Sequence, residues 1–266
     1  MKFSIVVVCL NPGEKLNQTL DSILKQSYTD YEIVVKDGGS KDGSIQGMHQ
    51  DARIALYEEA DKSIYDAMNQ AVSHARGEFL LFMNCGDFFY REDVLEKTVA
   101  LIEKCSEEGM NTGNMIFYGD TYGEKNDVHI TAPPEITGFT CYRNIPCHQA
   151  CFYAARLCKE KPYDLQYRIR ADYDHFLWCY YVAKAKMVNM KLTVASYEGG
   201  GYSESKENRK RDKEEHKLIT AAYMSKGELL KYQLIMLGTL APLRRVLAES
   251  KVFSGVYHWV KGKLYR

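Results

Sequence analysis

The segment from Phe3 to Asn11, FSIVVVCLN, constrains the fold of this chain more than any other. Seven of its nine residues are apolar, and they do not alternate with polar ones. A strand with one wet face alternates, whereas a strand buried on both faces is continuously apolar, which is typical of parallel sheets covered by helices. Pro12 and Gly13 follow directly and end the strand. The segment therefore predicts an α/β protein.

Segments with helical spacing alternate with strand-like runs along the rest of the chain. The first expected helix is residues 15–28, where Leu16, Leu20 and Ile23 share one face. The other expected helices are residues 63–77 (closed by Gly77), 92–105 and 171–185, and the other expected strands are residues 31–37, 53–58, 78–83, 115–124 and 186–198. This alternation predicts βαβ units and a mostly parallel sheet flanked by helices. Residues 131–171 hold four of the six prolines and resist assignment.

Bulk properties narrow the class of protein. The 266 residues suit one large α/β domain, alone or with an appendage. The 35 basic and 35 acidic side chains balance, so no overall field argues for a nucleic-acid partner. The apolar N-terminal run is too short for a signal peptide and lacks a cleavage site. No window reaches about 18 apolar residues, so we expect no transmembrane helix.

The eight cysteines are scattered and include no CxxC pair, which indicates a reduced cytosolic protein without a disulfide framework. The stretch CHQAC, with Cys147, His148 and Cys151, is a weak zinc alternative because its spacing fits no standard finger.

The C-terminal segment differs in charge from the rest. Between Lys226 and Arg266, eight cations stand against two anions, and apolar residues are interleaved with them. A basic amphipathic segment with Trp and Tyr can lie on an anionic membrane surface. The alternative is a pair of helices packed on the core with a solvated basic face, and both can hold together.

Small polar residues follow three of the expected strands. Asn11 ends the first, Asp37-Gly38-Gly39-Ser40 ends the second, and Asn84-Cys85-Gly86-Asp87 ends the strand of residues 78–83. In open parallel sheets, ligands bind outside the carboxyl ends of the strands, and glycines let a ligand approach the backbone. The pattern is neither GxGxxG nor a P-loop. It predicts a nucleotide-sized site at this edge.

Four ordered motifs give the chain a family resemblance. SIVVVCLN, QSYTDYEIVVKDGGSKDGS, DKSIYDAMNQAVSHARGEFLLFMNCGD and RADYDHFL resemble the family 2 glycosyltransferases of GT-A fold over roughly residues 2–205. The likeness is greatest to the bacterial subgroup that builds capsule, exopolysaccharide or O-antigen chains. It implies a GT-A domain at residues 1–205, which leaves residues 206–266 as a charged, helical C-terminal extension for which membrane association is one alternative.

The resemblance implies donor-binding roles for several residues. Asp37 would contact the nucleobase or ribose, Asn11 would line the same pocket, and Asp61 would face the donor. Their alternatives are an Asx-turn carboxylate for Asp37 and a strand-ending turn for Asn11. Asp66 and Asn69 share a helix face, and capping or local hydrogen bonds are the alternative to substrate contact.

The family usually carries Asp-x-Asp where this chain has Asn84 and, three residues later, Asp87. The resemblance assigns Asp87 to a divalent cation, Mg²⁺ or Mn²⁺, on the donor diphosphate, and Asn84 to the sugar or ribose. One carboxylate suffices because such cations keep phosphate oxygens and waters as ligands. The alternative for Asp87 is a turn residue.

The resemblance assigns the catalytic base to Asp172 in RADYDHFL, although Ala171 stands where Glu is common. Asp174 is the alternate base, and a helix N-cap is the structural alternative for Asp172. His148 and Gln149 would hold the sugar or acceptor, with a structural histidine as the alternative. Residues 198–205, EGGGYSES, resemble a loop that closes over the donor.

We therefore expect an inverting glycosyltransferase that moves a sugar from a nucleotide diphosphate donor, most simply a UDP-sugar, to an oligosaccharide or lipid-linked glycan acceptor. It would work in the cytoplasm at the inner membrane surface. The alternatives are a non-catalytic, membrane-peripheral nucleotide-sugar binding module and a sugar-phosphate nucleotidyltransferase. The latter should have a basic Gly-rich loop after the first strand, which CLNPGEKLNQ fits poorly.

Overall fold

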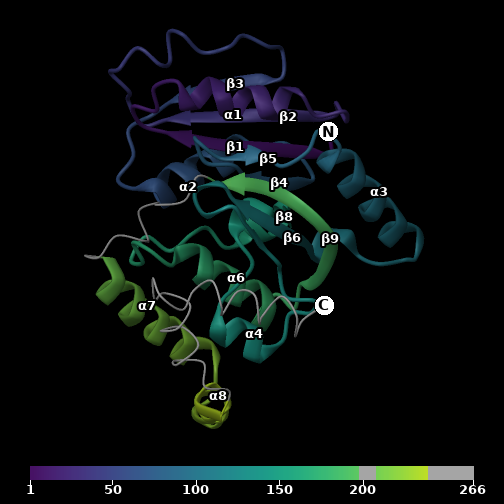
Figure 1. Cartoon of the computed structure of the whole chain (residues 1–266), viewed down its shortest axis with the longest axis vertical. Helices are drawn as coiled ribbons and strands as arrows, with labels where there is room; N and C mark the ends of the chain where they lie inside the picture. The colour runs from purple at the N-terminus through teal and green to yellow at the C-terminus, as the bar shows by residue number, and fades with distance from the viewer. Residues whose placement is uncertain (198–207, 239–266) are drawn as a thin grey trace. The chain divides into compact units, whose positions relative to one another are not determined.

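A nine-stranded mixed sheet organises the larger of the two units into which the chain divides, Met1–Ile219 (Figure 1). The computed structural model describes residues 1–197 and 208–238. The sheet order is β3-β2-β1-β4-β8-β6-β9-β5, with β7 paired to β6. The strands are β1 (Phe3–Cys9), β2 (Tyr31–Asp37), β3 (Ile54–Glu58), β4 (Phe79–Phe82), β5 (Phe88–Phe89), β6 (Met115–Gly123), β7 (Val128–Ile130), β8 (Cys151–Ala154) and β9 (Lys186–Tyr197).

The first half of the sheet is parallel, as the sequence predicted. β1 lies between β2 and β4, with Phe3 opposite Tyr31 on one side and Phe79 on the other, and β3 extends the parallel run beyond β2. Every residue of β1 and β2 is buried. This confirms the inference from the continuous apolar runs.

The second half of the sheet is mixed. β8 runs antiparallel to both β4 and β6, β9 runs parallel to β6, and β5 and β7 each pair antiparallel. Four of the eight described pairings are parallel, all but one of them in the first half. The expected parallel character thus belongs to β3-β2-β1-β4, where α1 connects β1 to β2, a loop connects β2 to β3, and α2 connects β3 to β4.

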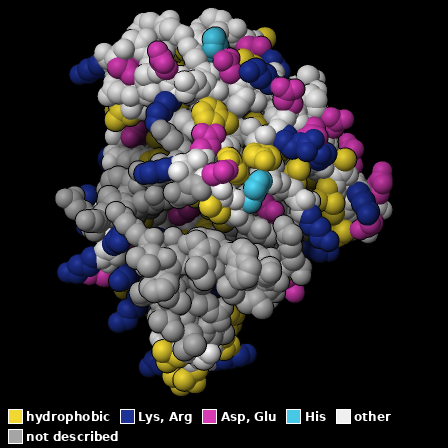
Figure 2. All heavy atoms as spheres, viewed as in Figure 1, with side chains coloured by type: hydrophobic (Ala, Val, Ile, Leu, Met, Phe, Trp, Pro, Cys, Tyr) yellow, Lys and Arg dark blue, Asp and Glu magenta, His cyan; other side chains and the backbone are white. Residues whose placement is uncertain are grey.

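The helices of this unit pack on the sheet at positions set by their apolar faces. α2 packs on β1 and β2, α1 contacts β5, and α3 packs against β9. The helices are α1 (Lys15–Leu24), α2 (Ile64–His74), α3 (Val94–Glu107), α4 (Gly138–Arg143), α5 (Ala155–Glu160), α6 (Ala171–Tyr181) and α7 (Asn208–Tyr223), with short 3₁₀ turns η1 (Thr112–Asn114), η2 (Glu124–Asn126) and η3 (His148–Ala150). In Figure 2, basic and acidic side chains are interspersed over the described part of the visible face.

Gly77 has a different role from the helix-closing one expected. α2 ends at His74, and Ala75 already leaves the helix with extended backbone. A Cβ at Gly77 would lie 2.5 Å from the backbone of Phe3 and Ser4. Its N–H also donates a 2.7 Å hydrogen bond to Ser4 Oγ. The glycine is needed because the chain passes directly against β1.

The division between the two units falls between Ile219 and Thr220, later than the expected boundary at residue 205. The first part of α7 belongs with the sheet because Asp212 and Glu215 bind the loop before α6. In the second unit, α8 (Lys226–Gly238) begins with a reciprocal cap, in which Ser225 N donates to Glu228 Oε2 at 2.8 Å and Glu228 N donates to Ser225 Oγ at 3.2 Å. The glycine-rich loop of residues 198–205 and the tail beyond residue 238 lie outside the described residues.

No helix in the described ranges is long and apolar enough to cross a membrane.

Candidate active site

The candidate site lies at the carboxyl edge of the parallel strands. β2, β1 and β4 are neighbours in the sheet, so the loops that follow them meet at one edge. Asp37 is the last residue of β2, Asn11 follows β1, and the segment from Asn84 to Asp87 follows β4. The structure therefore brings these predicted residues to the same edge.

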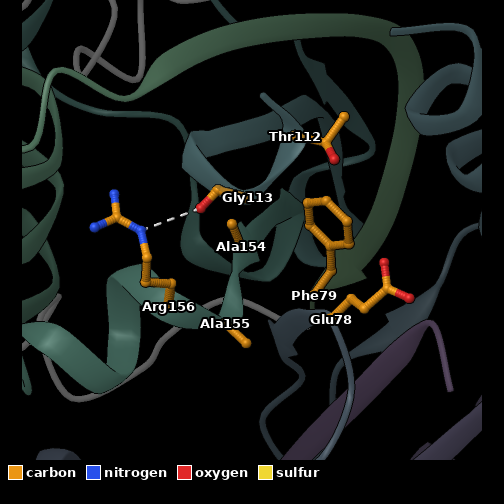
Figure 3. Close-up of a pocket in the computed structure, with 7 residues that line it drawn as sticks. All are labelled: Glu78, Phe79, Thr112, Gly113, Ala154, Ala155 and Arg156. Carbon is orange, nitrogen blue, oxygen red and sulfur yellow. Dashed lines mark hydrogen bonds between the residues drawn. The ribbon is translucent and has the colours of Figure 1, made fainter. Parts of the chain in front are cut away.

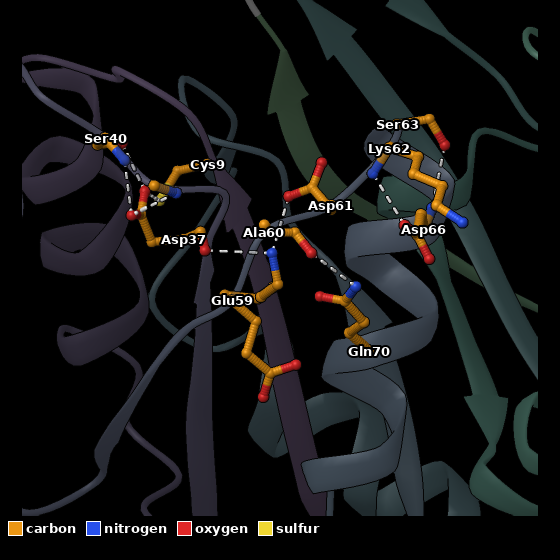
Figure 4. A network of polar contacts seen from close by, with 12 residues as sticks. Cys9, Asp37, Ser40, Glu59, Ala60, Asp61, Lys62, Ser63, Asp66 and Gln70 are labelled. Atoms are coloured by element: carbon orange, nitrogen blue, oxygen red, sulfur yellow. Dashed lines mark hydrogen bonds and ion pairs between the residues drawn. The ribbon is translucent and has the colours of Figure 1, made fainter.

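Asp37 shapes the loop that follows it (Figure 4). Its Oδ2 accepts hydrogen bonds from the N–H groups of Gly39 at 2.9 Å and Ser40 at 2.8 Å, and its Oδ1 accepts one from Ser40 Oγ at 2.5 Å. Burial alone would raise the pKa of this carboxyl, but the hydrogen bonds from Ser40 and Gly39 hold it below its usual value. Asp37 is fully buried. This is the Asx-turn arrangement, so the structure favours loop shaping over nucleobase contact for this residue.

Asn11 joins the loops after β1 and β2. It adopts left-handed backbone with φ of 50°. Its N–H donates to Ser40 Oγ at 2.7 Å, and its Oδ1 accepts from Lys41 N at 2.8 Å. The turn alternative thus describes Asn11, which binds the loop after β2 to the loop after β1.

Asp61 is paired with a lysine that the sequence reasoning overlooked. Lys36 Nζ lies 2.8 Å from Asp61 Oδ2 and also donates to the Asp37 carbonyl at 3.1 Å. The Lys36 side chain is completely buried, whereas 14% of the Asp61 side chain is exposed. A lysine inside a strand expected to be buried was the available signal, because a buried ammonium needs a nearby carboxylate.

Asp66 lies in the first turn of α2 and makes two hydrogen bonds at the start of the helix. Its N–H donates to Ser63 Oγ at 3.2 Å, and its Oδ2 accepts from Lys62 N at 2.8 Å (Figure 4). Both contacts are local, so the capping alternative accounts for this carboxylate.

Asn69 is occupied by the chain that leads to α6. Its Nδ2 donates to the Tyr163 carbonyl at 2.9 Å, and its Oδ1 accepts from Tyr163 N at 2.8 Å. Both ends of the amide therefore hold backbone groups, and the expected contact of Asn69 with the donor stays a prediction.

Asp87 stands in a rigid turn. Its N–H donates to the Asn84 carbonyl at 2.9 Å, and Gly86 between them has φ of 96°. Thr19 Oγ1 accepts from Gly86 N at 2.9 Å and donates to the Asp87 carbonyl at 3.0 Å. The turn alternative and the carboxylate role are compatible, since the turn uses only the backbone of Asp87.

Gln149 binds Asp87 directly. Its Nε2 donates to Asp87 Oδ2 at 2.8 Å, and Gln149 is buried. The amide therefore orients the Asp87 carboxylate, and the expected contact of Gln149 with the sugar or acceptor stays a prediction.

His148 links Asn84 to Asp172. Its Nε2 lies 3.2 Å from Asn84 Nδ2, and its Nδ1 lies 3.4 Å from Asp172 Oδ2. If the amide donates to Nε2, a ring proton of His148 lies on Nδ1, facing the carboxylate. Asn84 Oδ1 is buried and has no hydrogen-bond partner among the described residues. A buried oxygen of this kind calls for a ligand partner.

The neighbours of Asp172 favour the ionised form of its carboxyl group. It lies in the first turn of α6, whose N-cap is Arg170, so it is not the N-cap itself. Tyr65 Oη donates to its Oδ1 at 3.0 Å. Burial would raise the pKa of Asp172, but the hydrogen bond and charge of His148, followed by the Tyr65 hydroxyl, lower it below its usual value. Asp174, the alternate base, is buried and lies 3.3 Å from Lys161 Nζ. This ion pair makes Asp174 the weaker of the two candidates for the base.

Glu215 of α7 holds the loop before Asp172. Its two carboxylate oxygens accept hydrogen bonds from the N–H groups of Arg168 at 2.9 Å, Ile169 at 3.0 Å and Arg170 at 3.0 Å. Glu215 is buried. The sequence hid this role because Glu215 lies in the densely charged run NRKRDKEEHK, which is typical of a solvated face.

The zinc alternative gains no support. Cys147 Sγ donates to Gln149 Oε1 at 2.5 Å, and Cys151 Sγ donates to the Cys147 carbonyl at 3.3 Å. Within residues 1–197 and 208–238, no three His, Cys, Asp or Glu side chains gather closely enough to hold a metal ion.

A cavity of about 270 Å³ lies elsewhere (Figure 3). Glu78 and Phe79, at the start of β4, line it together with Arg156 of α5. Because the candidate residues follow the opposite end of β4, this cavity is separate from them.

The comparisons with known proteins agree with this arrangement. The fold is similar to Staphylococcus aureus TarS residues 1–349, solved with UDP, with a TM-score of 0.59 and 17% identity over 75% of this chain and 61% of that chain. It is also similar to the mannosyltransferase PcManGT of Pyrobaculum calidifontis, solved with GDP-Man and Mn²⁺, with a TM-score of 0.57 and 14% identity over 97% of this chain and 83% of that chain. The sheet and its covering helices thus define a GT-A glycosyltransferase fold.

The chain belongs to glycosyl transferase family 2, whose model matches residues 4–157. It is 34% identical over 208 residues, 76% of this chain and 78% of the relative, to the PGL/p-HBAD biosynthesis glycosyltransferase of Mycobacterium bovis. The protein is accordingly a transferase. The family match contains Asp37, Asp61 and Asp87, whereas Asp172 lies beyond it.

Proposed function

We propose that this protein transfers a sugar from a nucleotide diphosphate donor to a glycan hydroxyl with inversion, and that Asp172 is the base. The observation that carries the proposal is the pair His148-Gln149. His148 contacts Asp172 in the first turn of α6, and Gln149 contacts Asp87 in the turn after β4. One carboxylate suited to the acceptor and one suited to the diphosphate are thereby both bound by consecutive residues of η3.

In the proposed step, the acceptor hydroxyl gives its proton to Asp172 as its oxygen bonds to the anomeric carbon. The bond from that carbon to the phosphate oxygen breaks, and the electron pair leaves with the nucleoside diphosphate. Attack from the side opposite the leaving group inverts the anomeric centre. A positioned base of this kind contributes about 10²- to 10⁴-fold.

A divalent cation fits the donor set at Asp87. Its carboxylate and the buried Oδ1 of Asn84 are hard oxygen groups of the kind that Mg²⁺ and Mn²⁺ prefer. Asp87 would hold the ion, while Asn84 Oδ1 would face the ion or the donor. When bound, the cation neutralises the charge of the leaving diphosphate. Gln149 fixes the orientation of the Asp87 carboxylate through its hydrogen bond.

We infer a UDP-sugar as the donor. The fold relatives support this choice, since TarS was solved with UDP and with UDP-GlcNAc. Asp61, partly exposed and neutralised by Lys36, would face the nucleotide, in a pocket walled by the loops that Asn11 and Asp37 hold.

We further propose that the acceptor is lipid-linked and that the protein acts at the cytoplasmic face of the inner membrane. In this proposal the catalytic domain ends within α7, and the C-terminal extension contacts lipid. α8 supports this: Leu230, Leu234 and Leu237 are each more than half exposed and follow helical spacing along one stripe. Figure 2 shows apolar side chains beside basic ones over α8. Such a stripe with basic neighbours is typical of an interfacial helix.

The test is nucleotide release from UDP-glucose, UDP-GlcNAc, dTDP-glucose and GDP-mannose with Mn²⁺. We expect one donor to be turned over, and Asp87→Ala and Asp172→Ala to lower the rate at least about 100-fold. Wild-type rates in both variants would refute the proposal. Donor binding without turnover would instead favour the non-catalytic binding module.

A further inference from the structure

We propose that Tyr65 is a positioning residue for Asp172: its hydroxyl holds Oδ1, so that Oδ2 is the oxygen that receives the acceptor proton. The inference rests on the proposed role of Asp172 as base. It gives a physical task to a residue of the motif IYDAMN that neither the resemblance nor the donor site explains.

The geometry singles out one carboxylate oxygen. Tyr65 Oη lies 3.0 Å from Asp172 Oδ1 and 2.7 Å from the Ile169 carbonyl. The other oxygen, Oδ2, faces His148 Nδ1 at the longer distance of 3.4 Å. His148 and Tyr65 are the titratable side chains that contact the Asp172 carboxylate, and Cys147, Cys151, Tyr163 and His175 also interact with its charge. Oδ1 is bound at normal hydrogen-bond distance, whereas Oδ2 is held more loosely and can accept a further proton donor.

Tyr65 can serve only as a donor here. Burial, followed by the charge of Asp172, raises the pKa of its hydroxyl well above the usual value. The phenol therefore stays protonated near neutral pH, where Asp172 is ionised. Its single proton is directed at two acceptors, the carboxylate and the Ile169 carbonyl, which ties the side chain of the base to the backbone just before α6.

A second contact from the same helix face supports this task. Asn69 lies four residues after Tyr65, so the two side chains project from neighbouring turns of α2. Asn69 binds the N–H and the carbonyl of Tyr163, at the start of the loop that leads to α6 and Asp172. The spacing Tyr-x-x-x-Asn thus places two hydrogen-bonding groups against one loop.

The consequence for the proton transfer is specific. The acceptor O–H bond breaks, its proton goes to Oδ2 of Asp172, and the electron pair of that bond becomes the new bond to the anomeric carbon. The pair of the old glycosyl bond leaves with the diphosphate. Without the Tyr65 hydroxyl, the carboxylate can rotate about its Cβ–Cγ bond, and the share of molecules with Oδ2 in position falls.

The experiment compares Tyr65→Phe with a matched control, Tyr173→Phe. Tyr173 Oη donates to the Cys141 carbonyl at 2.5 Å, so its loss also removes a buried tyrosine hydrogen bond but leaves the Asp172 side chain with its partners. Asp172 is observed through its carboxyl carbon in protein carrying ¹³C-aspartate, with the signal assigned by its loss in Asp172→Asn. Circular dichroism defines the acid range in which each variant stays folded.

We expect the Asp172 signal in Tyr65→Phe to titrate about one pH unit above the wild type, since a hydrogen bond to a charged group is worth about 1.5 to 3 kcal/mol and one unit is about 1.4 kcal/mol. Tyr173→Phe should leave the titration unchanged. An unchanged titration in Tyr65→Phe, or an equal change in both variants, would overturn the inference.

Turnover separates this inference from the proposed function. With the donor that is turned over best among UDP-glucose, UDP-GlcNAc and GDP-mannose, kcat of Tyr65→Phe should fall about 10- to 100-fold with the KM for donor unchanged. A fall in donor affinity with kcat intact would contradict positioning of the base. A shifted titration in a protein that turns over no donor would support the Tyr65 contact and refute the proposed function.

Discussion

The side-chain amide of Gln149 donates a 2.8 Å hydrogen bond to Oδ2 of Asp87, 62 residues earlier in the chain. The preceding residue, His148, lies against Asp172. One 3₁₀ turn, η3, therefore contacts both carboxylates to which the proposed reaction assigns a task.

Gln149→Ala should weaken activation by Mn²⁺. The carboxylate of Asp87 would lose the donor that orients it, and losing such a partner typically costs about 10- to 100-fold in metal affinity or activity. The measurement is the Mn²⁺ dependence of nucleotide release at fixed donor. Gln50→Ala is the control, since that exposed amide binds only the Met48 carbonyl in its own loop. Equal Mn²⁺ dependence in wild type and Gln149→Ala would contradict this role.

His148→Gln should move the acid limb of kcat to higher pH. The folded-state pKa of Asp172 is lowered, after burial is offset, mainly by His148. The ionised base is therefore retained as pH falls, until the pH passes through that lowered pKa. Removing the Nδ1–H donor raises the pKa, so protonation begins at higher pH. His148→Asn can keep a donor near Nδ1 and should restore the wild-type limb. A limb that does not move in His148→Gln counts against the contact.

Lys36→Met should destabilise the protein through Asp61. Breaking a buried pair leaves one charge uncompensated, and because Asp61 keeps some exposure we expect a loss of about 2 kcal/mol in the free energy of unfolding. Urea unfolding measures it. The double variant Lys36→Met/Asp61→Asn should regain part of the loss. Lys41→Met, at an exposed position, should change stability by less than about 0.5 kcal/mol. Equal losses at the two lysines would rule out the pairing as the cause.

Glu215→Gln should loosen the loop before Asp172. The carboxylate accepts three backbone hydrogen bonds, and an amide would turn an N–H donor toward N–H groups. We expect a loss of about 3 kcal/mol in unfolding free energy. Hydrogen exchange of residues 168–170 should become faster.

Glu214→Gln is the matched control for Glu215→Gln, because that neighbouring side chain is 62% exposed. Its exchange rates should equal those of the wild type. If Glu215→Gln also showed wild-type exchange, the clamp would be refuted.

Replacing Leu230, Leu234 and Leu237 with Gln should reduce co-sedimentation with phosphatidylglycerol vesicles. The three exposed leucines of α8 would supply apolar area to the membrane interface. The full-length chain is used, with Ile130→Gln and Val182→Gln as exposed apolar controls outside α8. Equal binding by the triple variant and the wild type would remove α8 from the membrane proposal.

The parallel half of the sheet could be predicted because it rests on local pattern. β1 is a nearly continuous apolar run, β2 has the apolar centre Ile33-Val34-Val35, and the expected strand at residues 78–83 became β4 at Phe79–Phe82. The expected helix of residues 171–185 became α6 at Ala171–Tyr181. The second half depends on pairing between distant short runs. Nothing within Cys151–Ala154 indicates that this strand enters between β4 and β6, because its partners lie far away in sequence.

The candidate site was predictable in its positions more than in its contacts. Asp37 and Asp87 lie at the sheet edge where the strand-end pattern put them. The local contact of Asp37 with Ser40 was open to prediction as an Asx-turn, whereas the contacts of Lys36 with Asp61 and of Gln149 with Asp87 follow from tertiary packing. Glu215 shows the limit most clearly. The run NRKRDKEEHK around it has the composition of a solvated helix face, yet Glu215 is buried and accepts hydrogen bonds from three backbone N–H groups.

The adjacency of His148 and Gln149 makes this part of the chain sensitive to length. Consecutive Cα atoms are about 3.8 Å apart, so the two side chains reach their two carboxylates from anchors one peptide unit apart. A substitution at either position removes one contact and leaves the other. A single inserted or deleted residue in η3 would displace at least one of the two side chains from its carboxylate. In natural variants of this chain, length changes should therefore be absent from η3 and from the buried strand β8 that follows it directly.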